Sequence, residues 1–124
     1  MARPRAFDEE EVVRQAAVTF AELGYNGCSI DDLLSATGLK RGSLYKAFGS
    51  KRNLFIGCLT QELVGNWSKT ELAVDLVIVA LRDLCSKDKA IRQICIAAMR
   101  EVWKDNEGKA AQFLGRRLLS RLEI

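Results

Sequence analysis

The sequence predicts an all-α protein, because three of its features indicate helices along the whole chain. Apolar residues recur every three or four positions, which is the spacing of one face of a helix. Residues that cap helices, among them Asp8 and Ser29, stand before these stretches, and glycines such as Gly24 and Gly38 follow them. No stretch shows the strict alternation of apolar and polar residues that a half-buried strand needs. We therefore expect helices joined by short turns.

Each expected helix is bounded by such signals. In chain order they cover about residues 8–23 with Asp8 as the cap, a stretch from the cap Ser29 to about Thr37, about 40–47, a stretch after the cap Ser50, about 70–85, about 89–104, and a last helix with Asp105 as its cap.

The stretch from Ser29 to Arg52 carries the strongest functional signal. Its apolar residues are spaced so that two short helices dock on each other across a turn at Gly38. Outside this buried face the stretch is basic, and no Asp or Glu occurs between Asp32 and Glu62. A helix pair with one buried face and one uncompensated cationic face is typical of a helix-turn-helix. The apolar residues are Ile30, Leu33 and Leu34 on one helix and Leu39, Leu44 and Phe48 on the other, and the basic ones are Lys40, Arg41, Lys46, Lys51 and Arg52.

Side chains in and around the second of these helices suit the acceptors of a DNA duplex. The major groove of B-DNA admits one α-helix, whose first residues reach the base edges. Gly42 leaves room for a close approach of the backbone, Tyr45 offers a phenolic donor to a phosphate, and the free amides near Ser29 could hold another phosphate. A solvated basic face is the alternative, but the turn, the caps and the buried pattern together favour DNA binding. The residues expected to contact DNA are Arg3 and Arg5 in a short basic arm, Ser29, Lys40, Arg41, Gly42, Ser43, Tyr45, Lys46 and Lys51.

Residues 3–60 resemble the N-terminal domain of the TetR family of transcriptional regulators. The resemblance implies that Tyr45 and Lys51 contact phosphates and that residues 40–46 read the major groove. It further implies a homodimer on a pseudo-palindromic operator, which represses until a small-molecule inducer binds the C-terminal domain. The most specific matching residues are Phe20, Gly24 and Tyr25, the run Ser29-Ile30-Asp31-Asp32-Leu33, and the series Gly42-Ser43-Leu44-Tyr45, Phe48, Ser50-Lys51 and Leu54.

Two features depart from the family pattern. Lys40 stands where the family commonly has a small capping residue, and the loss of a cap costs about 1 kcal/mol. The chain also ends after about three C-terminal helices, whereas family members usually continue for several more. We therefore expect a DNA-binding domain over residues 1–52 and a small helical ligand-binding and dimerisation domain over 53–124 that is incomplete.

A ligand pocket in the second half would draw on the large side chains there. The residues considered for it are Phe55, Leu59, Trp67, Cys95, Met99 and Trp103, although an ordinary core is the favoured interpretation for them. The four cysteines form no CxxC pair and are most simply small buried apolar groups. The alternative function is a redox- or partner-sensing module, in which a cysteine or the C-terminal helices receive the signal.

The residue inventory argues against an enzyme. The chain has no histidine, which excludes Ser-His-Asp and Cys-His arrangements. The Gly49-Ser50-Lys51 tripeptide lacks the glycine spacing of a phosphate-binding loop, and no metal-ligand spacing occurs. We expect no catalytic residue, no metal and no cofactor.

The sequence also shows neither the pattern of a signal peptide nor that of a membrane span. The opening residues have no apolar core like that of a signal peptide. The most apolar run, from Leu72 to Leu81, has about ten residues, whereas a membrane span needs roughly twenty. We expect a cytoplasmic protein whose main partner is double-stranded DNA.

Overall fold

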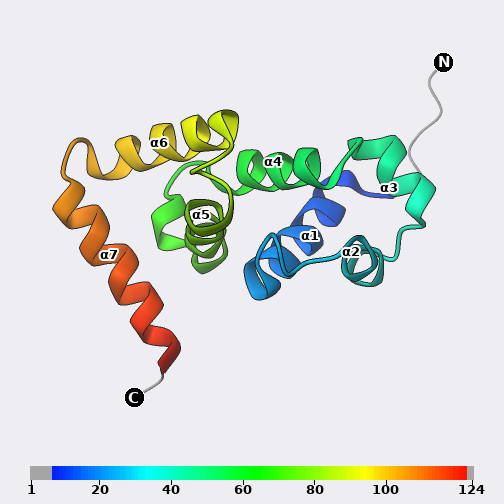
Figure 1. Ribbon diagram of the computed structural model, residues 1–124, viewed down its shortest axis with the longest axis horizontal. Coiled ribbons are helices and arrows are strands. Elements are labelled where there is room, and N and C mark those ends of the chain that lie inside the picture. Colours follow the sequence, from blue (N-terminus) through cyan, green and yellow to red (C-terminus); the bar gives the residue numbers. More distant parts are fainter. Residues whose placement is uncertain (1–6, 123–124) are drawn as a thin grey trace.

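The computed structural model describes residues 7–122, and over that range its regular structure is entirely helical (Figure 1). This confirms the expected all-α class. The helices are α1 (Glu9–Leu23), α2 (Ile30–Thr37), α3 (Arg41–Phe48), α4 (Lys51–Glu62), α5 (Glu71–Asp83), α6 (Lys89–Trp103) and α7 (Glu107–Leu119), with short 3₁₀ turns at Trp67–Lys69 and Ser120–Leu122. Among these described helices, none has the length and apolar character needed to cross a membrane.

Polar side chains start α1, α2 and α4 as expected. Asp8 accepts hydrogen bonds from two backbone N–H groups in the first turn of α1. At α2, Ser29 Oγ accepts from the N–H of Asp32 at 3.0 Å, and Asp32 Oδ2 accepts from the N–H of Ser29 at 2.9 Å. Ser50 Oγ accepts from the N–H of Asn53 at 3.0 Å. Each cap satisfies donors that a helix N-terminus leaves without a partner.

The starts of α3 and α7 differ from this pattern. Lys40 occupies the N-cap position of α3 and makes no side-chain capping bond, as its chemistry predicts. The cap of α7 is Asn106, which accepts from the N–H of Lys109 at 3.0 Å, so the expectation of Asp105 was wrong. The chain leaves α6 through Lys104, whose φ is +55°, and the N–H of Asn106 then bonds the carbonyl of Trp103. This turn brings Asn106 to the start of the helix.

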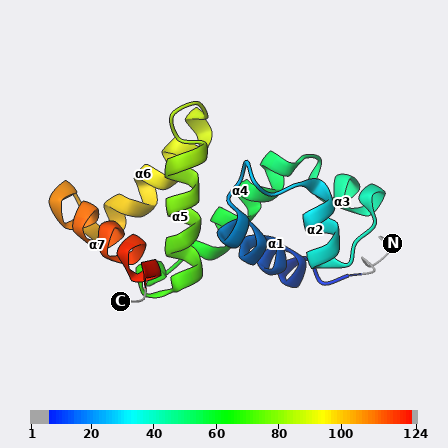
Figure 2. The ribbon, with the colours of Figure 1, turned by 60° about the horizontal axis from the view of Figure 1, so that its bottom comes forward.

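The helices form two groups, and α4 and α5 lie between them. Figures 1 and 2 show α1, α2 and α3 at one end of the molecule and α6 and α7 at the other. Helix α1 packs against α2, α4 and α5, and α4 also touches α6. The position of α3 is therefore fixed through α2 and α4, far from α7.

One large buried cluster holds α1–α4 to the helices that follow. Phe20 of α1 meets Phe55 of α4 edge to face, with ring centroids 5.0 Å apart, and stacks on Tyr25 at 5.8 Å. Leu33 of α2 and Leu44 of α3 are fully buried in the same cluster. These contacts fix the orientation of both helices of the predicted helix-turn-helix.

A second, smaller cluster surrounds Trp67. The indole Nε1 of Trp67 donates to the carbonyl of Ala98 at 3.3 Å, and its ring meets Trp103 edge to face at 5.7 Å. Trp67 begins the 3₁₀ turn that follows α4. This cluster joins that turn to α5 and α6.

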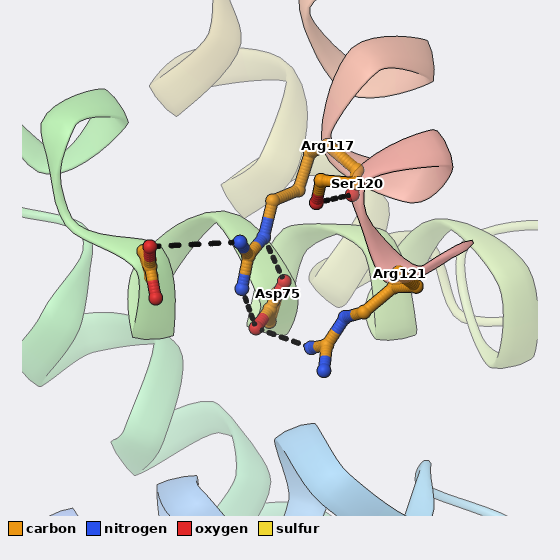
Figure 3. A network of polar contacts seen from close by, with 5 residues as sticks. Asp75, Arg117, Ser120 and Arg121 are labelled. Atoms are coloured by element: carbon orange, nitrogen blue, oxygen red, sulfur yellow. Dashed lines mark hydrogen bonds and ion pairs between the residues drawn. The ribbon is translucent and has the colours of Figure 1, made fainter. Parts of the chain in front are cut away.

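Helix α7 and the 3₁₀ turn after it are joined to α5 by a group of ion pairs, and Leu114 packs against the smaller cluster. Asp75 accepts two hydrogen bonds of 2.8 Å from Arg117 and one of 2.7 Å from Arg121, as Figure 3 shows. Within α7 only Ala110 is buried. Phe113, Leu118, Leu119 and Leu122 are exposed.

Candidate nucleic-acid interface

A sharp turn at Gly38 sets the angle between α2 and α3. Gly38 has φ +73° and ψ 4°, a left-handed conformation that glycine adopts without steric cost. Leu33 and Leu44, both fully buried, pack on either side of this turn. Because the apolar side of α3 is used in this contact, its opposite side faces solvent.

The exposed side of α3 carries several of the residues that were expected from the sequence to contact DNA. Lys40, Arg41, Ser43 and Lys46 are exposed, and Tyr45 is 41% exposed. Gly42 is exposed as well, and an added Cβ there would meet nothing within 4 Å. Among the described residues, α3 packs mainly against α2 and α4, and it lies at the opposite end of the molecule from α6 and α7 (Figures 1 and 2). A rigid partner could reach this surface without a rearrangement of the fold.

Ser29 lies at the start of α2 with part of its hydrogen-bonding capacity already used. The N–H of Ser29 donates to Asp32. This amide is therefore not free for a phosphate, although free amides were expected near Ser29. The hydroxyl oxygen of Ser29 accepts from the N–H of Asp32, and hydrogen bonds from Ser29 lower the pKa of the Asp32 carboxyl. The hydrogen-bonding groups of Ser29 are thus largely used in the cap of α2.

Lys51 lies over the ring of Tyr25, a contact that was not expected from the sequence. The Nζ atom of Lys51 lies 4.4 Å from the centroid of the Tyr25 ring, in a cation–π contact. Tyr25 is itself packed against Phe20 and Phe55. The half-buried Lys51 thus has a defined position at the N-terminus of α4.

Two of the five basic residues are paired, so the expectation of an uncompensated cationic face was wrong for them. Arg41 Nη2 lies 2.6 Å from Asp31 Oδ1 on α2. Arg52 binds both carboxylate oxygens of Asp88, at 2.6 and 3.2 Å. Within residues 7–122, the exposed Lys46 has no carboxylate at ion-pair distance, and the same holds for Lys40 and Lys51. The surface around α3 remains cationic through its lysines.

Two carboxylates, one at the end of α5 and one at the cap of α6, contact the loop before α2 and the start of α4. Asp83 accepts hydrogen bonds from the backbone N–H groups of Tyr25 and Asn26 at 2.9 and 3.4 Å. Its pKa is lowered to about 2, first by a hydrogen bond from Arg82. The pKa of Asp88 is also lowered to about 2, first by the hydrogen bond from Arg52 and then by the N–H of Ile91. Both carboxylates favour the ionised form in the folded state.

These shifts predict how the free energy of unfolding depends on pH. Because both folded-state pKa values lie below the ordinary 3.8, the two carboxylates stabilise the fold above about pH 4, and this contribution is lost as the pH falls from about 4 to about 2. In the variant Arg52→Gln, the pKa of Asp88 should rise towards its ordinary value while that of Asp83 stays low. NMR titration of the side-chain carboxyl groups measures both. An unchanged Asp88 pKa in this variant would contradict the assigned cause.

The other expected contact residues, Arg3 and Arg5, lie outside the described residues. The six residues considered for a ligand pocket do not meet in one cavity. Phe55, Leu59 and Cys95 are buried in the large cluster, and Trp67 is buried in the smaller one. Met99 and Trp103 border an open hollow of about 370 Å³ between α6 and α7.

All four cysteines, Cys28, Cys58, Cys85 and Cys95, are buried and unpaired. Burial raises the pKa of Cys28 to about 11 and that of Cys95 to about 12, and it raises the pKa of the other two as well. Reactive cysteines are accessible and have lowered pKa values, so these thiols have the properties of small core residues.

Comparison with known proteins agrees with this geometry. The model of the family described as "Bacterial regulatory proteins, tetR family" matches residues 12–58, which run from α1 into α4. An uncharacterized HTH-type transcriptional regulator, YezE of Bacillus subtilis, is 43% identical over 65 residues, or 52% of this chain and 34% of the relative. The HTH-type transcriptional repressor BdcR of Escherichia coli is 31% identical over 99 residues, or 80% of this chain and 45% of the relative.

A third relative, the HTH-type transcriptional repressor AcnR of Corynebacterium glutamicum, is 38% identical over 53 residues, which cover 43% of this chain and 28% of the relative. The chain spans less than half the length of each of these three relatives. No solved structure matches it significantly. Residues 12–58 therefore match the N-terminal part of the tetR family of bacterial regulatory proteins, and the three relatives are named as HTH-type transcriptional regulators or repressors.

Proposed function

We propose that this chain is a sequence-specific DNA-binding transcriptional repressor. The observation that carries the proposal is the exposed side of α3, where cations and hydrogen-bond donors gather on a helix whose other side is buried at Leu44. A helix of this kind is the element that enters the major groove in helix-turn-helix proteins. The relatives BdcR and AcnR are named as repressors, which supports repression as the output.

The exposed residues divide into two groups by position. Those at the start of α3, Lys40, Arg41 and Ser43, would read base edges, because the first residues of a recognition helix lie deepest in the groove. Gly42 would allow the backbone to approach the duplex. The residues around them, Ser29, Tyr45, Lys46 and Lys51, would bind phosphates and fix the register.

The same geometry supports a proposal for the operator and the oligomer. One short helix reads only a few base pairs, so a specific site needs two copies on half-sites about 34–36 Å apart. We propose a homodimer on a palindromic operator, with residues 1–52 as the DNA-binding domain and residues 53–124 as part of a dimerisation and ligand-binding domain. A small molecule bound there would release the DNA. A regulator of this kind acts in the cytoplasm, where the DNA is accessible.

The alternative in which a cysteine receives the signal has less support. It requires an accessible thiol of low pKa, whereas the four thiols are buried and their pKa values are raised. The version in which a protein partner is sensed would use the exposed apolar residues of α7.

Selection from a random duplex pool tests the proposal. The chain should enrich duplexes with two related half-sites in inverted orientation, one helical turn or a multiple of it apart. Sedimentation of the chain with an enriched duplex should give two chains per duplex. Enrichment of no sequence over the starting pool would contradict the proposal, and a one-to-one complex would contradict its dimeric form.

A further inference from the structure

The pair formed by Asp31 and Arg41 places a negative charge on the surface that the proposed function turns towards DNA. Asp31 is the second residue of α2 and Arg41 is the first residue of α3, and the two side chains join at 2.6 Å. Both are well exposed, with 80% of the Asp31 side chain and 54% of the Arg41 side chain accessible. The pair therefore lies at the start of α3, beside the exposed side of that helix.

Folding accounts for only part of this pair, because Asp31 lies in the first turn of α2, where the helix N-terminus favours an anion by a modest amount. Ion pairs that are this exposed contribute little to stability, because water and salt screen them. The capping of α2 does not require Asp31 either, since Ser29 and Asp32 complete that cap between them. A carboxylate opposite a polyanion also weakens binding to any duplex through repulsion. Its place beside Arg41 therefore calls for a role in the DNA complex.

The chemistry of the guanidinium group indicates that role. Arginine has five N–H donors in a planar fork, and a guanine edge accepts two of them at O6 and N7. Asp31 engages Nη2 of Arg41 and leaves donors of the same fork available. The pairing also limits the rotamers of Arg41 and reduces the attraction of its charge to the phosphates. An arginine held in this way is directed to a base edge.

We propose that Asp31 is a specificity-determining positioning residue, which holds Arg41 for a guanine in the major groove and makes its binding to phosphates less favourable. The inference rests on the proposed function and adds to it one residue on α2, outside the recognition helix. It predicts two measurable effects of Asp31. Asp31 lowers the affinity for random sequence, and it raises the ratio of affinities for duplexes with and without the contacted guanine.

The variant Asp31→Asn tests the proposal in the full chain. Its probes are a duplex selected by the unmodified chain, the same duplex with a single guanine replaced, and a random duplex of equal length. Affinity for the random duplex should rise, and discrimination against the replaced guanine should fall by about three- to tenfold. The variant Asp31→Glu, which keeps the carboxylate, should retain most of the discrimination.

Two controls separate positioning from plain charge. Glu22→Gln removes the same charge from an exposed position on α1 and should leave the discrimination unchanged. In an Arg41→Ala background, Asp31→Asn should no longer affect discrimination, because there is no guanidinium to position. Thermal unfolding of each variant confirms that the fold is retained.

The outcomes distinguish this inference from the proposed function. If the unmodified chain binds selected and random duplexes equally, the proposed function itself is wrong. If the unmodified chain discriminates, but Asp31→Asn changes all three affinities by the same factor, Asp31 acts only through its charge and the inference is overturned. The same conclusion follows if the effect on discrimination persists without Arg41.

Discussion

Replacing Lys46 and Lys51 together by alanine is expected to weaken binding to selected and random duplexes alike, by roughly a hundredfold in Kd. Lys46 is exposed on α3 without a carboxylate partner, and Lys51 is held at the start of α4 by the ring of Tyr25. Each would lose one charge-assisted contact to a phosphate. Because phosphates carry no sequence information, the ratio between the two affinities should change little.

The salt dependence of binding gives an independent measure of the same contacts. Each phosphate contact releases counterions, so the slope of log K against log salt should become less steep by about 1.8 in the double variant. The matched control replaces Lys69 and Lys109, two exposed lysines outside the helix-turn-helix region, by alanine. If this control weakened binding and lowered the slope as much as the test variant does, the phosphate contacts would not lie where we propose.

Replacing Phe20 by alanine is expected to lower the free energy of unfolding by about 3–5 kcal/mol. Phe20 is fully buried, stacks on Tyr25 and meets Phe55 edge to face. The large loss follows because the removed ring leaves a cavity in the cluster that fixes α1, α2, α3 and α4. Since domains of this size are stable by only about 5–15 kcal/mol, much of the margin would be gone.

Urea unfolding measures this loss against a neighbour on the same helix. Val18 is 41% exposed on α1, so Val18→Ala should change the free energy of unfolding by no more than about 0.5 kcal/mol. Phe20→Ala should also loosen Tyr25 and with it the position of Lys51. Equal effects of the two substitutions would contradict the assigned core.

The features that the sequence predicted well are those set by residues close together in the chain. The caps at Asp8, Ser29 and Ser50 and the turn at Gly38 depend on two to four neighbouring residues, and all of them form as expected. The spacing of apolar residues likewise places within a residue or two those helix boundaries that it predicted, but it left open the ends of α4 and α7. The cap of α7 at Asn106 was missed because Asp105 and Asn106 are both good caps, and the preceding turn decides between them.

The features that the sequence could not predict depend on residues far apart. The pairing of Arg52 with Asp88 spans 36 positions, and that of Asp83 with the N–H of Tyr25 spans 58. The pairing of Arg41 with Asp31 spans only ten positions, but it depends on the angle between α2 and α3. Because no acidic residue occurs between Asp32 and Glu62, the positive charges of this stretch were expected to have no carboxylate partner. The cation–π contact of Lys51 with Tyr25 was also missed.

We propose that DNA meets the exposed side of α3 together with the adjoining starts of α2 and α4. Amide chemical shifts of the isotope-labelled chain, recorded during titration with a selected duplex, test it most directly. We expect shifts concentrated at residues 29–31, 40–46 and 50–52, with little change along α7. Shifts gathered on α6 and α7, with α3 unaffected, would contradict the account.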